Sequence, residues 1–336
     1  MTNNEKIISP DRSRIDPGVY FGLDETTYHS DPALGSTDIR LLRNAPYDWY
    51  WHRIHNQHVP QDDEDGAWVS ESDLIEEDSQ AIRKNDGRAV GTAIHLFVLA
   101  GKDEFARRYM RRPAHINKLS EDKARKIAVN GEKIMHHEDY DRAVIASAAI
   151  LANPKISGAF RGGFPEVSVF WIGEFEGRKI PLKARFDFLK PAATVDLKSI
   201  RNSQERPFVD ACLHRIADKR YDIQAEHYCE GRRQMRSLVA AGEVHGCPDH
   251  GLLWRIAEPE QAVFAFVFFQ TNGAPLTLAR KISPANPMLV TARDDIDAAL
   301  AQYVTIAERF GFDTPWLLEE EVEELHAEDL PPWYRR

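Results

Sequence analysis

Apolar residues follow two different repeats along this chain. Short runs that alternate apolar and polar residues, or that are apolar throughout, predict β-strands. Such runs lie at 19–21, 165–172, 179–189, 194–197 and 262–269. The last run reads AVFAFVFF and is the most apolar, so we expect it to be the central or closing strand of a sheet.

Longer stretches carry apolar residues at the spacing of an amphipathic helix. In 88–100 these residues predict a buried helix, and they are Ala89, Val90, Ala93, Ile94, Phe97 and Val98. Ser36 is a candidate N-cap for a helix that buries Ile39 and Leu42. Further helices are predicted at 120–152, 208–241 and 294–310.

The order of these elements predicts the fold class. A helix is followed by three strands, a helix and another strand, which favours an α/β fold with a mixed central β-sheet flanked by α-helices. Residues 1–80 are expected to wrap this core; within them 1–16 are polar and expected to be disordered, and 61–80 form an acidic loop. The core itself is predicted at 81–316, and 317–336 form an acidic C-terminal tail.

The net charge of −10 argues at first against a protein that binds nucleic acid. The acidic residues are segregated, however. Residues 61–80 hold nine acids and no base, and residues 317–329 hold seven acids and no base. The remaining core, 81–316, has 35 Lys and Arg against 29 Asp and Glu, a surplus of +6. A locally basic surface of this kind permits binding to phosphates.

Several classes of protein are disfavoured by composition and motifs. Mean hydropathy is −0.48, and no apolar run approaches the ~18 residues of a membrane helix. The polar N-terminus lacks a secretion signal, and the three cysteines form no CxxC pair, so we expect a cytoplasmic protein without a structural zinc or iron–sulfur site. Neither GxxxxGK[ST], GxGxxG nor GxSxG occurs, which excludes the common nucleotide-binding loops and the hydrolase elbow.

The richest candidate chemistry lies in 183–199, KARFDFLKPAATVDLKS. Two short strands flank a Lys-Pro-Ala-Ala turn, so a hairpin would bring Asp187, Asp196 and Lys198 together at one sheet edge. Two carboxylates suit a hard cation such as Mg²⁺, and a neighbouring ammonium suits an anionic reaction centre. The alternative is an ordinary surface ion pair.

Other polar residues have both a structural and a functional interpretation. His95 lies among apolar helical positions, where it is either a buried core residue or a metal ligand. Gln224 and Tyr228 share one helix face by their i, i+4 spacing, as plain surface or as part of a site. Four arginines could contact phosphates or form a solvated face, and they are Arg107, Arg108, Arg111 and Arg112.

Four segments, taken in order, resemble the PD-(D/E)XK nuclease superfamily. They are Gly91–His95, Lys183–Asp187, Asp196–Lys198 and Gln224–Tyr228. More narrowly, residues 17–230 are similar to the RecE-type (exonuclease VIII-like) branch. Phe186 stands where the superfamily motif has proline.

The resemblance implies a role for each candidate residue. His95, Asp187, Asp196 and the carbonyl of Leu197 would bind one or two Mg²⁺ ions, and the imidazole is compatible with Mn²⁺ as well. Lys198 would orient the attacking water or stabilise the developing charge. Glu166 corresponds to the first acidic residue of the family, with an outer role at the metal. Gln224 and Tyr228 would contact DNA or position Lys198.

The resemblance also implies an activity: a Mg²⁺-dependent exonuclease that degrades linear double-stranded DNA from its ends, 5′ to 3′, by two-metal phosphodiester hydrolysis. It further implies a ring-shaped homo-oligomer that serves recombination with a single-strand annealing partner protein. Two alternatives remain open. One is a structure-specific or restriction-like endonuclease, and the other is a non-catalytic DNA-binding protein on the same fold.

Overall fold

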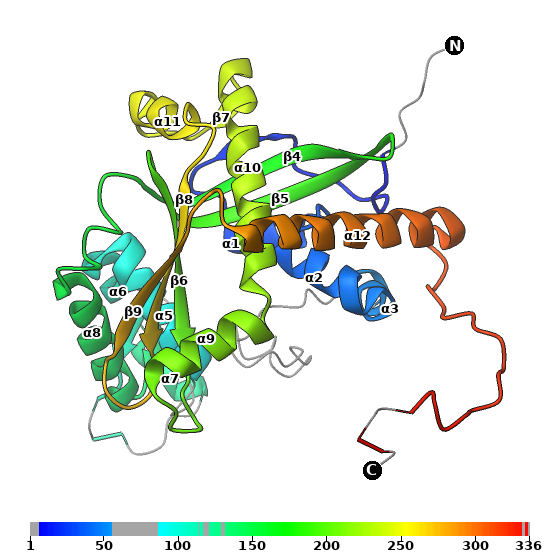
Figure 1. Ribbon diagram of the computed structural model, residues 1–336. Helices are drawn as coiled ribbons and strands as arrows, with labels where there is room; N and C mark the ends of the chain where they lie inside the picture. Colours follow the sequence, from blue (N-terminus) through cyan, green and yellow to red (C-terminus); the bar gives the residue numbers. More distant parts are fainter. Residues whose placement is uncertain are drawn as a thin grey trace.

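The computed structural model describes residues 7–55, 87–113, 115–116, 121–128, 132–330 and 333–334. A seven-stranded sheet with strand order β7-β1-β4-β5-β6-β8-β9 forms its centre (Figure 1). Its strands are β1 (Gly18–Tyr20), β4 (Phe164–Phe175), β5 (Arg178–Lys190), β6 (Ala193–Ile200), β7 (Val244–His245), β8 (Val263–Gln270) and β9 (Thr277–Ile282). A separate two-stranded sheet pairs β2 (Tyr109–Arg111) with β3 (Lys133–Met135).

The large sheet is mixed, as predicted. Strands β4, β5 and β6 form an antiparallel meander, whereas β6 runs parallel to β8 and β7 runs parallel to β1. Strand β8 is an interior strand between β6 and β9. Its side chains alternate between two apolar layers, which explains why the whole run is apolar: Phe264, Phe266 and Phe268 enter one cluster, and Val267 and Phe269 enter the other.

Helices cover both faces of this sheet (Figure 1), which confirms the predicted α/β class. The helices are α1 (Glu25–Ser30), α2 (Ser36–Asn44), α3 (Pro46–Tyr50), the π-helix η1 (Trp51–His55), α5 (Gly87–Ala100), α6 (Lys102–Arg108), α7 (Glu121–Ile127), α8 (His137–Ala152), α9 (Phe208–Asp218), α10 (Tyr221–Ala241), α11 (His250–Ala257) and α12 (Pro287–Phe310). One apolar layer contains α2, α3, α10 and α12, and the other contains α5, α6 and α8. Within the described residues, no helix combines the length and the apolar character that a membrane crossing demands.

Several predicted boundaries are wrong. The helix expected at 120–152 is interrupted by β3, and an Asn-Gly turn signal stands at 130–131 in the sequence. The helix expected at 208–241 is divided, because Arg220 adopts φ 50° and the left-handed conformation cannot continue a helix. The N-cap of α2 is Gly35 rather than Ser36.

The N-terminal segment is more ordered than its polar composition indicated. Within 7–16, Ile8 is buried, and its N–H donates to the carbonyl oxygen of Lys179 at 2.9 Å. The expectation of disorder is therefore wrong for this part of the chain. The acidic segment 61–80 lies outside the described residues, whereas 317–330 is an exposed coil that runs away from the sheet (Figure 1).

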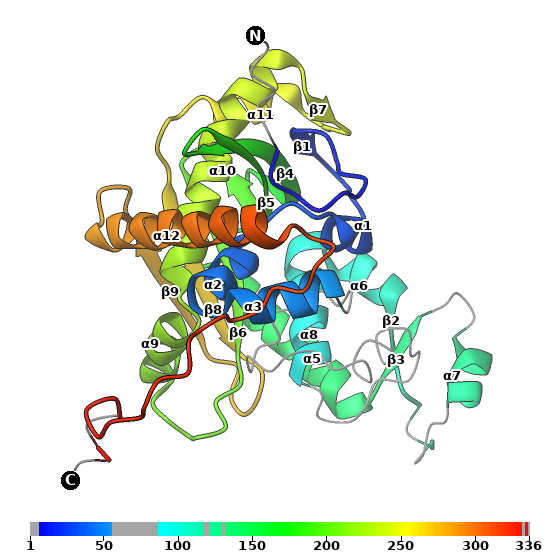
Figure 2. The same cartoon turned by 90° about the vertical axis from the view of Figure 1, so that its right-hand side faces the viewer.

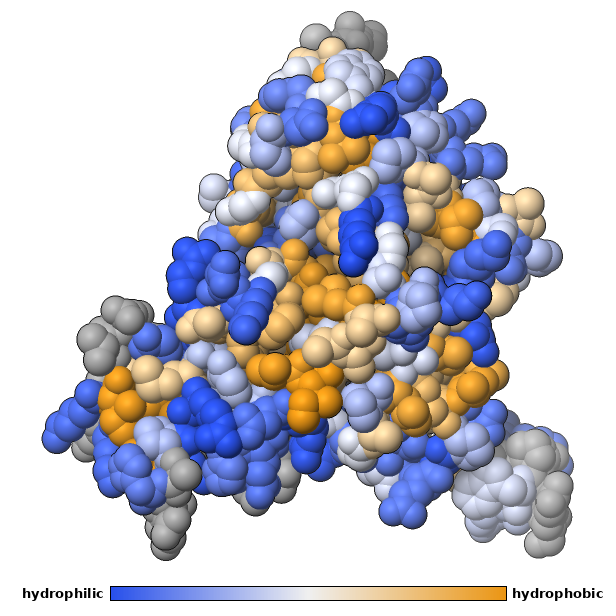
Figure 3. Space-filling view, turned by 90° about the vertical axis from the view of Figure 1, so that its left-hand side faces the viewer, coloured by the Kyte–Doolittle hydropathy of each residue, from blue (hydrophilic) through white to orange (hydrophobic). Residues whose placement is uncertain are grey.

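The surface is uneven in character despite the net negative charge. The face that carries α8, β9 and α11 exposes apolar residues among charged ones (Figure 3). Ile145 of α8 and Trp254 of α11 are 58% and 47% exposed. Charge and apolar area are thus distributed in patches rather than mixed evenly.

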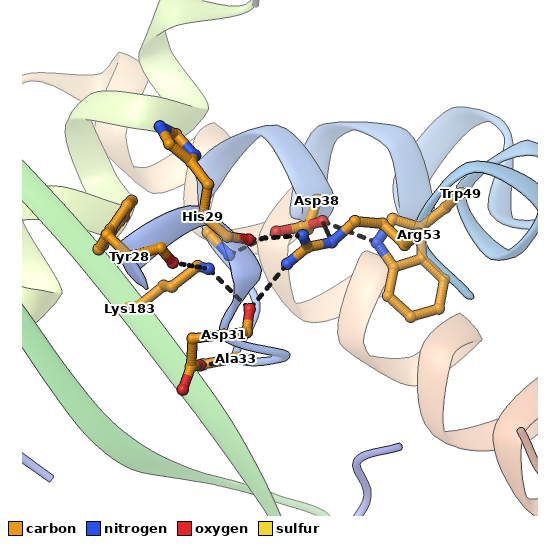
Figure 4. A network of polar contacts seen from close by, with 9 residues as sticks. Tyr28, His29, Asp31, Ala33, Asp38, Trp49, Arg53 and Lys183 are labelled. Carbon is orange, nitrogen blue, oxygen red and sulfur yellow. Dashed lines mark hydrogen bonds and ion pairs between the residues drawn. The ribbon is translucent and has the colours of Figure 1, made fainter. Parts of the chain in front are cut away.

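A buried polar cluster joins the N-terminal helices to β5 (Figure 4). The Nζ of Lys183 donates to the carbonyl oxygens of Tyr28 at 2.7 Å and Asp31 at 2.8 Å. Burial, aided by the charge of Arg53, lowers the pKa of Lys183 to about 7. The loop after α1 is therefore fixed to the strand that carries Asp187.

The same cluster continues into α2 and η1. The guanidinium of Arg53 pairs with Asp38 at 3.0 Å and donates to the carbonyl oxygens of His29 and Asp31, both at 3.1 Å. The indole of Trp49 donates to the same carboxylate oxygen that Arg53 contacts, Asp38 Oδ1, at 2.9 Å. Buried groups of this kind are stable only when they are paired, so the N-terminal helices and β5 hold one another in place.

We predict a specific pH dependence from Lys183. Because its pKa is lower in the folded state, the unfolded chain binds more protons between about pH 7 and 10, and stability should rise with pH across that window. Lys183→Met should abolish this rise. It should also destabilise the fold by ~1–3 kcal/mol, because the buried carbonyl oxygens of Tyr28 and Asp31 each lose a hydrogen bond and only Asp31 keeps a second donor, Arg53. Urea unfolding of the wild type and of Lys183→Met at about pH 7 and pH 10 measures this. An equal rise in stability in the two proteins would contradict the prediction.

Candidate active site

The two predicted carboxylates meet where β5 and β6 separate. The antiparallel pairing of these strands runs from Lys190–Ala193 to Phe188–Val195, and Asp187 and Asp196 are the next residues in register. Beyond that point the Oδ2 of Asp187 accepts a hydrogen bond from the backbone N–H of Leu197 at 2.6 Å. The expected location at a sheet edge is wrong, because both strands lie inside the sheet and the site opens between them.

Asp196 is the most enclosed member of the group. Its side chain is 2% exposed, and its Oδ1 accepts from Gln224 Nε2 at 3.0 Å. The Nζ of Lys198 lies 3.0 Å from its Oδ2, and the Lys198 side chain is 21% exposed. This ion pair lacks hydrogen-bond geometry, since Oδ2 is buried without a hydrogen-bond donor. The lysine is thus the solvent-facing partner of the pair, and one buried carboxylate oxygen keeps lone pairs available.

Burial and charge set the ionisation of these three groups. Burial raises the pKa of Asp196 to about 6, against the opposing attraction of Lys198. Burial likewise raises the pKa of Asp187. For Lys198 burial acts to lower the pKa, but attraction to Asp196 and Asp187 outweighs it and raises the pKa. The site is therefore a pair of acids that would be costly to ionise without a neighbouring cation.

His95 of α5 borders this group. Its ring packs at an angle against Phe269, with 5.8 Å between ring centroids, and the residue is only half-buried. Burial and then the charge of Lys198 lower the pKa of His95 to about 4, while Asp196 and the backbone of Leu197 act in the opposite direction. The imidazole is therefore neutral at pH 7, which is the form that binds metals.

Tyr228 lies one helical turn after Gln224 on α10. It is 9% exposed and its ring contacts Phe186 edge-on, with 5.2 Å between centroids. Burial and the charge of Asp196 raise its pKa, while a side-chain hydrogen bond with Gln224 lowers it. Tyr228 therefore supports Gln224 from the core rather than from the helix surface.

Glu166 lies across from Asp187 on β4, between the register pairs Pro165–Phe188 and Val167–Phe186. Its φ of 49° is left-handed, which costs about 1–3 kcal/mol for a residue with a side chain. The carboxylate is half-exposed and lies 3.7 Å from Arg185. Its charge contributes to the raised pKa of Asp187, so Glu166 is at the border of the group rather than inside it.

One positioning residue was not predicted. Arg232 of α10 is 4% exposed, and it donates to the carbonyl oxygens of Pro191 at 2.8 Å and Ala193 at 3.1 Å, which flank the β5–β6 turn. It also donates to Ile256 of α11 at 2.9 Å. The sequence held a signal, because Arg232 falls on the apolar face of its helix, four residues after Tyr228 and three before Met235.

The side chains of this group include the donor types that a divalent cation prefers. Among the described residues, no group of three or more His, Cys, Asp and Glu side chains is arranged as a complete metal site. The donors present are nevertheless suitable: two carboxylates, one with a buried oxygen lacking a hydrogen bond, and a neutral imidazole. Lys198 stands 3.0 Å from the oxygen that a cation would use, so a cation at Asp196 requires the ammonium to move.

Comparison with known proteins identifies the family. The sequence model of a "PDDEXK-like domain of unknown function (DUF3799)" matches residues 69–240, half of the chain. The chain belongs to this family. The PDDEXK-like match contains β4, β5, β6 and α5, and therefore contains Asp187, Asp196, Lys198 and His95. The predicted superfamily is confirmed, whereas the RecE-type branch is not distinguished.

Similarity to solved structures is weak. A provisionally named exonuclease of Eubacterium rectale has 15% identity and a TM-score of 0.40, covering 68% of this chain and 70% of its own. A phage-related exonuclease of Haemophilus somnus has 14% identity and a TM-score of 0.27, covering 65% and 94%. These values establish no shared activity. No curated protein sequence is recognisably similar to the PDDEXK-like chain.

Substitution of His95 distinguishes a structural core histidine from a metal ligand. We predict that His95→Ala leaves melting of the metal-free protein almost unchanged and weakens Mg²⁺ or Mn²⁺ binding by roughly 10-fold or more. A core histidine would instead lose ~1–3 kcal/mol of stability without a specific effect on metal. Calorimetric titration and thermal melting in a chelator measure both quantities, with the exposed His214→Ala as control. Normal metal binding in a destabilised His95 variant would refute the ligand role.

Proposed function

We propose that this protein is a metal-dependent exonuclease that degrades linear double-stranded DNA. The observation that carries the proposal is the pairing of half-buried Asp187 with buried Asp196, with Lys198 3.0 Å from Asp196, inside a PDDEXK-like core. A surface ion pair would not need two neighbouring acids with raised pKa values. This cost is understandable if the acids serve a reaction.

Each residue of the group has a definite task in phosphodiester hydrolysis. Nucleases with a PDDEXK core generally use a divalent cation, which on binding supplies a Lewis acid and lowers the pKa of water. Asp187 and Asp196, with His95 and the Leu197 carbonyl, would hold it. The proposed two-metal hydrolysis would need two such cations. We propose Mg²⁺ as the physiological ion, with Mn²⁺ as an alternative that the site would also accept.

The remaining residues act on the phosphate and on Asp196. The water oxygen forms a bond to phosphorus as the P–O bond to the leaving 3′-oxygen of a nucleotide breaks; the water gives up a proton, the leaving oxygen takes one up from solvent, and negative charge grows on the phosphate oxygens. The Lys198 ammonium is the nearest mobile cation to that charge. Gln224 keeps Asp196 oriented through its 3.0 Å hydrogen bond, and Tyr228 supports Gln224. Glu166 would act from outside, through the charge it places beside Asp187.

A small polar pocket lies next to the acids. It is lined by Ser36, Thr37, Arg40, Lys219, Arg220, Tyr221 and Gln224. Gln224 also binds Asp196, and the ring of Tyr221 lies 5.2 Å from Lys198 Nζ, so the pocket adjoins the site directly. The pocket is only about 10 Å³, room for a single water molecule, and Arg220 is already paired with Asp222 and Asp295. Its cationic side chains would therefore contact a DNA phosphate only from the rim of the pocket, and our proposal of 5′-to-3′ digestion rests on the RecE-type resemblance.

The biological setting is a further part of the proposal. The RecE-type resemblance favours a homo-oligomer that acts on double-stranded DNA ends in recombination and passes single strands to an annealing protein. The sequence motifs are its support. Tests of the chemistry come first, because each of these steps depends on it.

We predict that Lys198→Ala retains metal and DNA binding but lowers the single-turnover cleavage rate by roughly 10²-fold or more, since a cation beside a developing charge acts in the transition state. Quenched-flow kinetics at saturating DNA measure this rate. Lys281→Ala, at an exposed position on β9, is the control. A Lys198 variant with a near wild-type rate would show that this lysine is only structural.

The end requirement gives a second prediction. Linear duplex should shorten progressively and leave single strands in the presence of Mg²⁺, while covalently closed circles survive. Gel analysis of both substrates is sufficient. Discrete fragments from closed circles would support an endonuclease, and linear DNA that is bound but never shortened would support a non-catalytic protein.

A further inference from the structure

The positive charge of the core is concentrated in one short region. Residues 101–136 contain ten Lys and Arg against five Asp and Glu. This surplus of five accounts for nearly all of the +6 carried by 81–316. The rest of the core is almost neutral.

This region is here named the basic arm and consists of α6, which packs in one of the two main apolar layers, and of β2, α7 and β3, which project from it. Figure 2 shows β2, β3 and α7 extending away from the α5–α8 pair. The arm has its own small apolar cluster of Ala124, Ala128 and Ile134, separate from the two main layers. Arg111 fixes its base through a bidentate pair with Asp141 of α8, at 2.8 and 2.7 Å.

The cations of the arm fall into two groups. Arg107 pairs with Glu104 and Arg111 pairs with Asp141, so a structural role explains these two of the four arginines considered from sequence. Four other cations on the arm are exposed, and within the described chain no ion pair involves them. They are Lys102, Arg108, Lys123 and Lys126. Cations outnumber acids two to one in 101–136, so this surface favours a polyanion.

The location of the arm favours DNA as the polyanion. Helix α6 follows α5 directly after Gly101, and α5 carries His95, so the arm continues from a helix that borders the candidate active site. The acidic residues 317–329 leave the fold from the end of α12, well apart from the arm in Figure 2. DNA that enters the site would therefore lie nearer to the arm than to the acidic tail.

We propose that the basic arm binds the phosphate backbone of the duplex beyond the active site and holds the substrate there without reading its sequence. The choice of DNA as ligand rests on the proposed function. Lys102, Arg108, Lys123 and Lys126 supply binding and no chemistry. Such binding releases counterions, so its signature is the salt dependence of affinity.

The test replaces these four residues together with glutamine. Duplex binding, measured by fluorescence anisotropy in a chelator over a range of NaCl, should weaken by roughly 10-fold or more. The slope of log K against log salt should become shallower by about 0.9 for each phosphate that the variant no longer neutralises. With Mg²⁺, KM for duplex should rise while the single-turnover rate at saturating DNA stays unchanged. A matched variant carries glutamine at four exposed cations elsewhere, Lys155, Arg236, Arg255 and Lys281, and should resemble the wild type.

The outcomes separate this inference from the proposed function. If the wild type cleaves DNA and the arm variant binds duplex with an unchanged salt slope, the arm assignment is overturned and the nuclease stands. If the wild type never cleaves but the arm variant alone binds more weakly and with a shallower slope, the arm is supported and the nuclease fails. Equal weakening in the arm variant and the matched variant would overturn the arm assignment, because it would reflect net charge alone.

Discussion

The rest of the site depends on holding two carboxylates side by side in the interior of the sheet. Burial disfavours their ionised forms, and each acid disfavours the charge of the other. Three contacts offset this cost: the Leu197 N–H to Asp187, the Gln224 amide to Asp196, and the Lys198 ammonium beside Asp196. Each comes from a different local geometry, so the strand separation, the position of α10 and the face of β6 must all be correct together.

That geometry is maintained from outside by buried cations that touch no substrate. Arg232 holds both carbonyl groups beside the β5–β6 turn, and thereby fixes how the two strands separate at Asp187 and Asp196. Lys183, four residues before Asp187, fixes the middle of β5 to the N-terminal helices. In both cases the partners are carbonyl oxygens rather than carboxylates. The cation is thus held by directional hydrogen bonds, which define position more strictly than an ion pair between flexible side chains does.

The sequence predicted the features that depend on contacts between residues close together in the chain. The β5–β6 hairpin has a two-residue turn, so the meeting of Asp187, Asp196 and Lys198 followed from strand alternation. It could not give the strand order, because the place of β7 beside β1 and of β9 beside β8 is decided by packing between distant segments. Nor could it give the interruption of a long helical pattern at Arg220, where two ion pairs, to Asp222 and Asp295, hold a left-handed residue in place. Local sequence propensity does not contain information about such distant ion-pair partners.

The network around Lys183 changes how the limits of this protein are understood. The family match begins at residue 69, after the helices that supply the carbonyl groups of Tyr28 and Asp31. A gene fragment cut at that limit would remove the carbonyl acceptors of the Lys183 amine and would remove Ile39, Leu42 and Trp49 from the main core. The span by which relatives are recognised is therefore shorter than the span that folds. A recombinant version of the matched span 69–240 must therefore include the N-terminal helices as well.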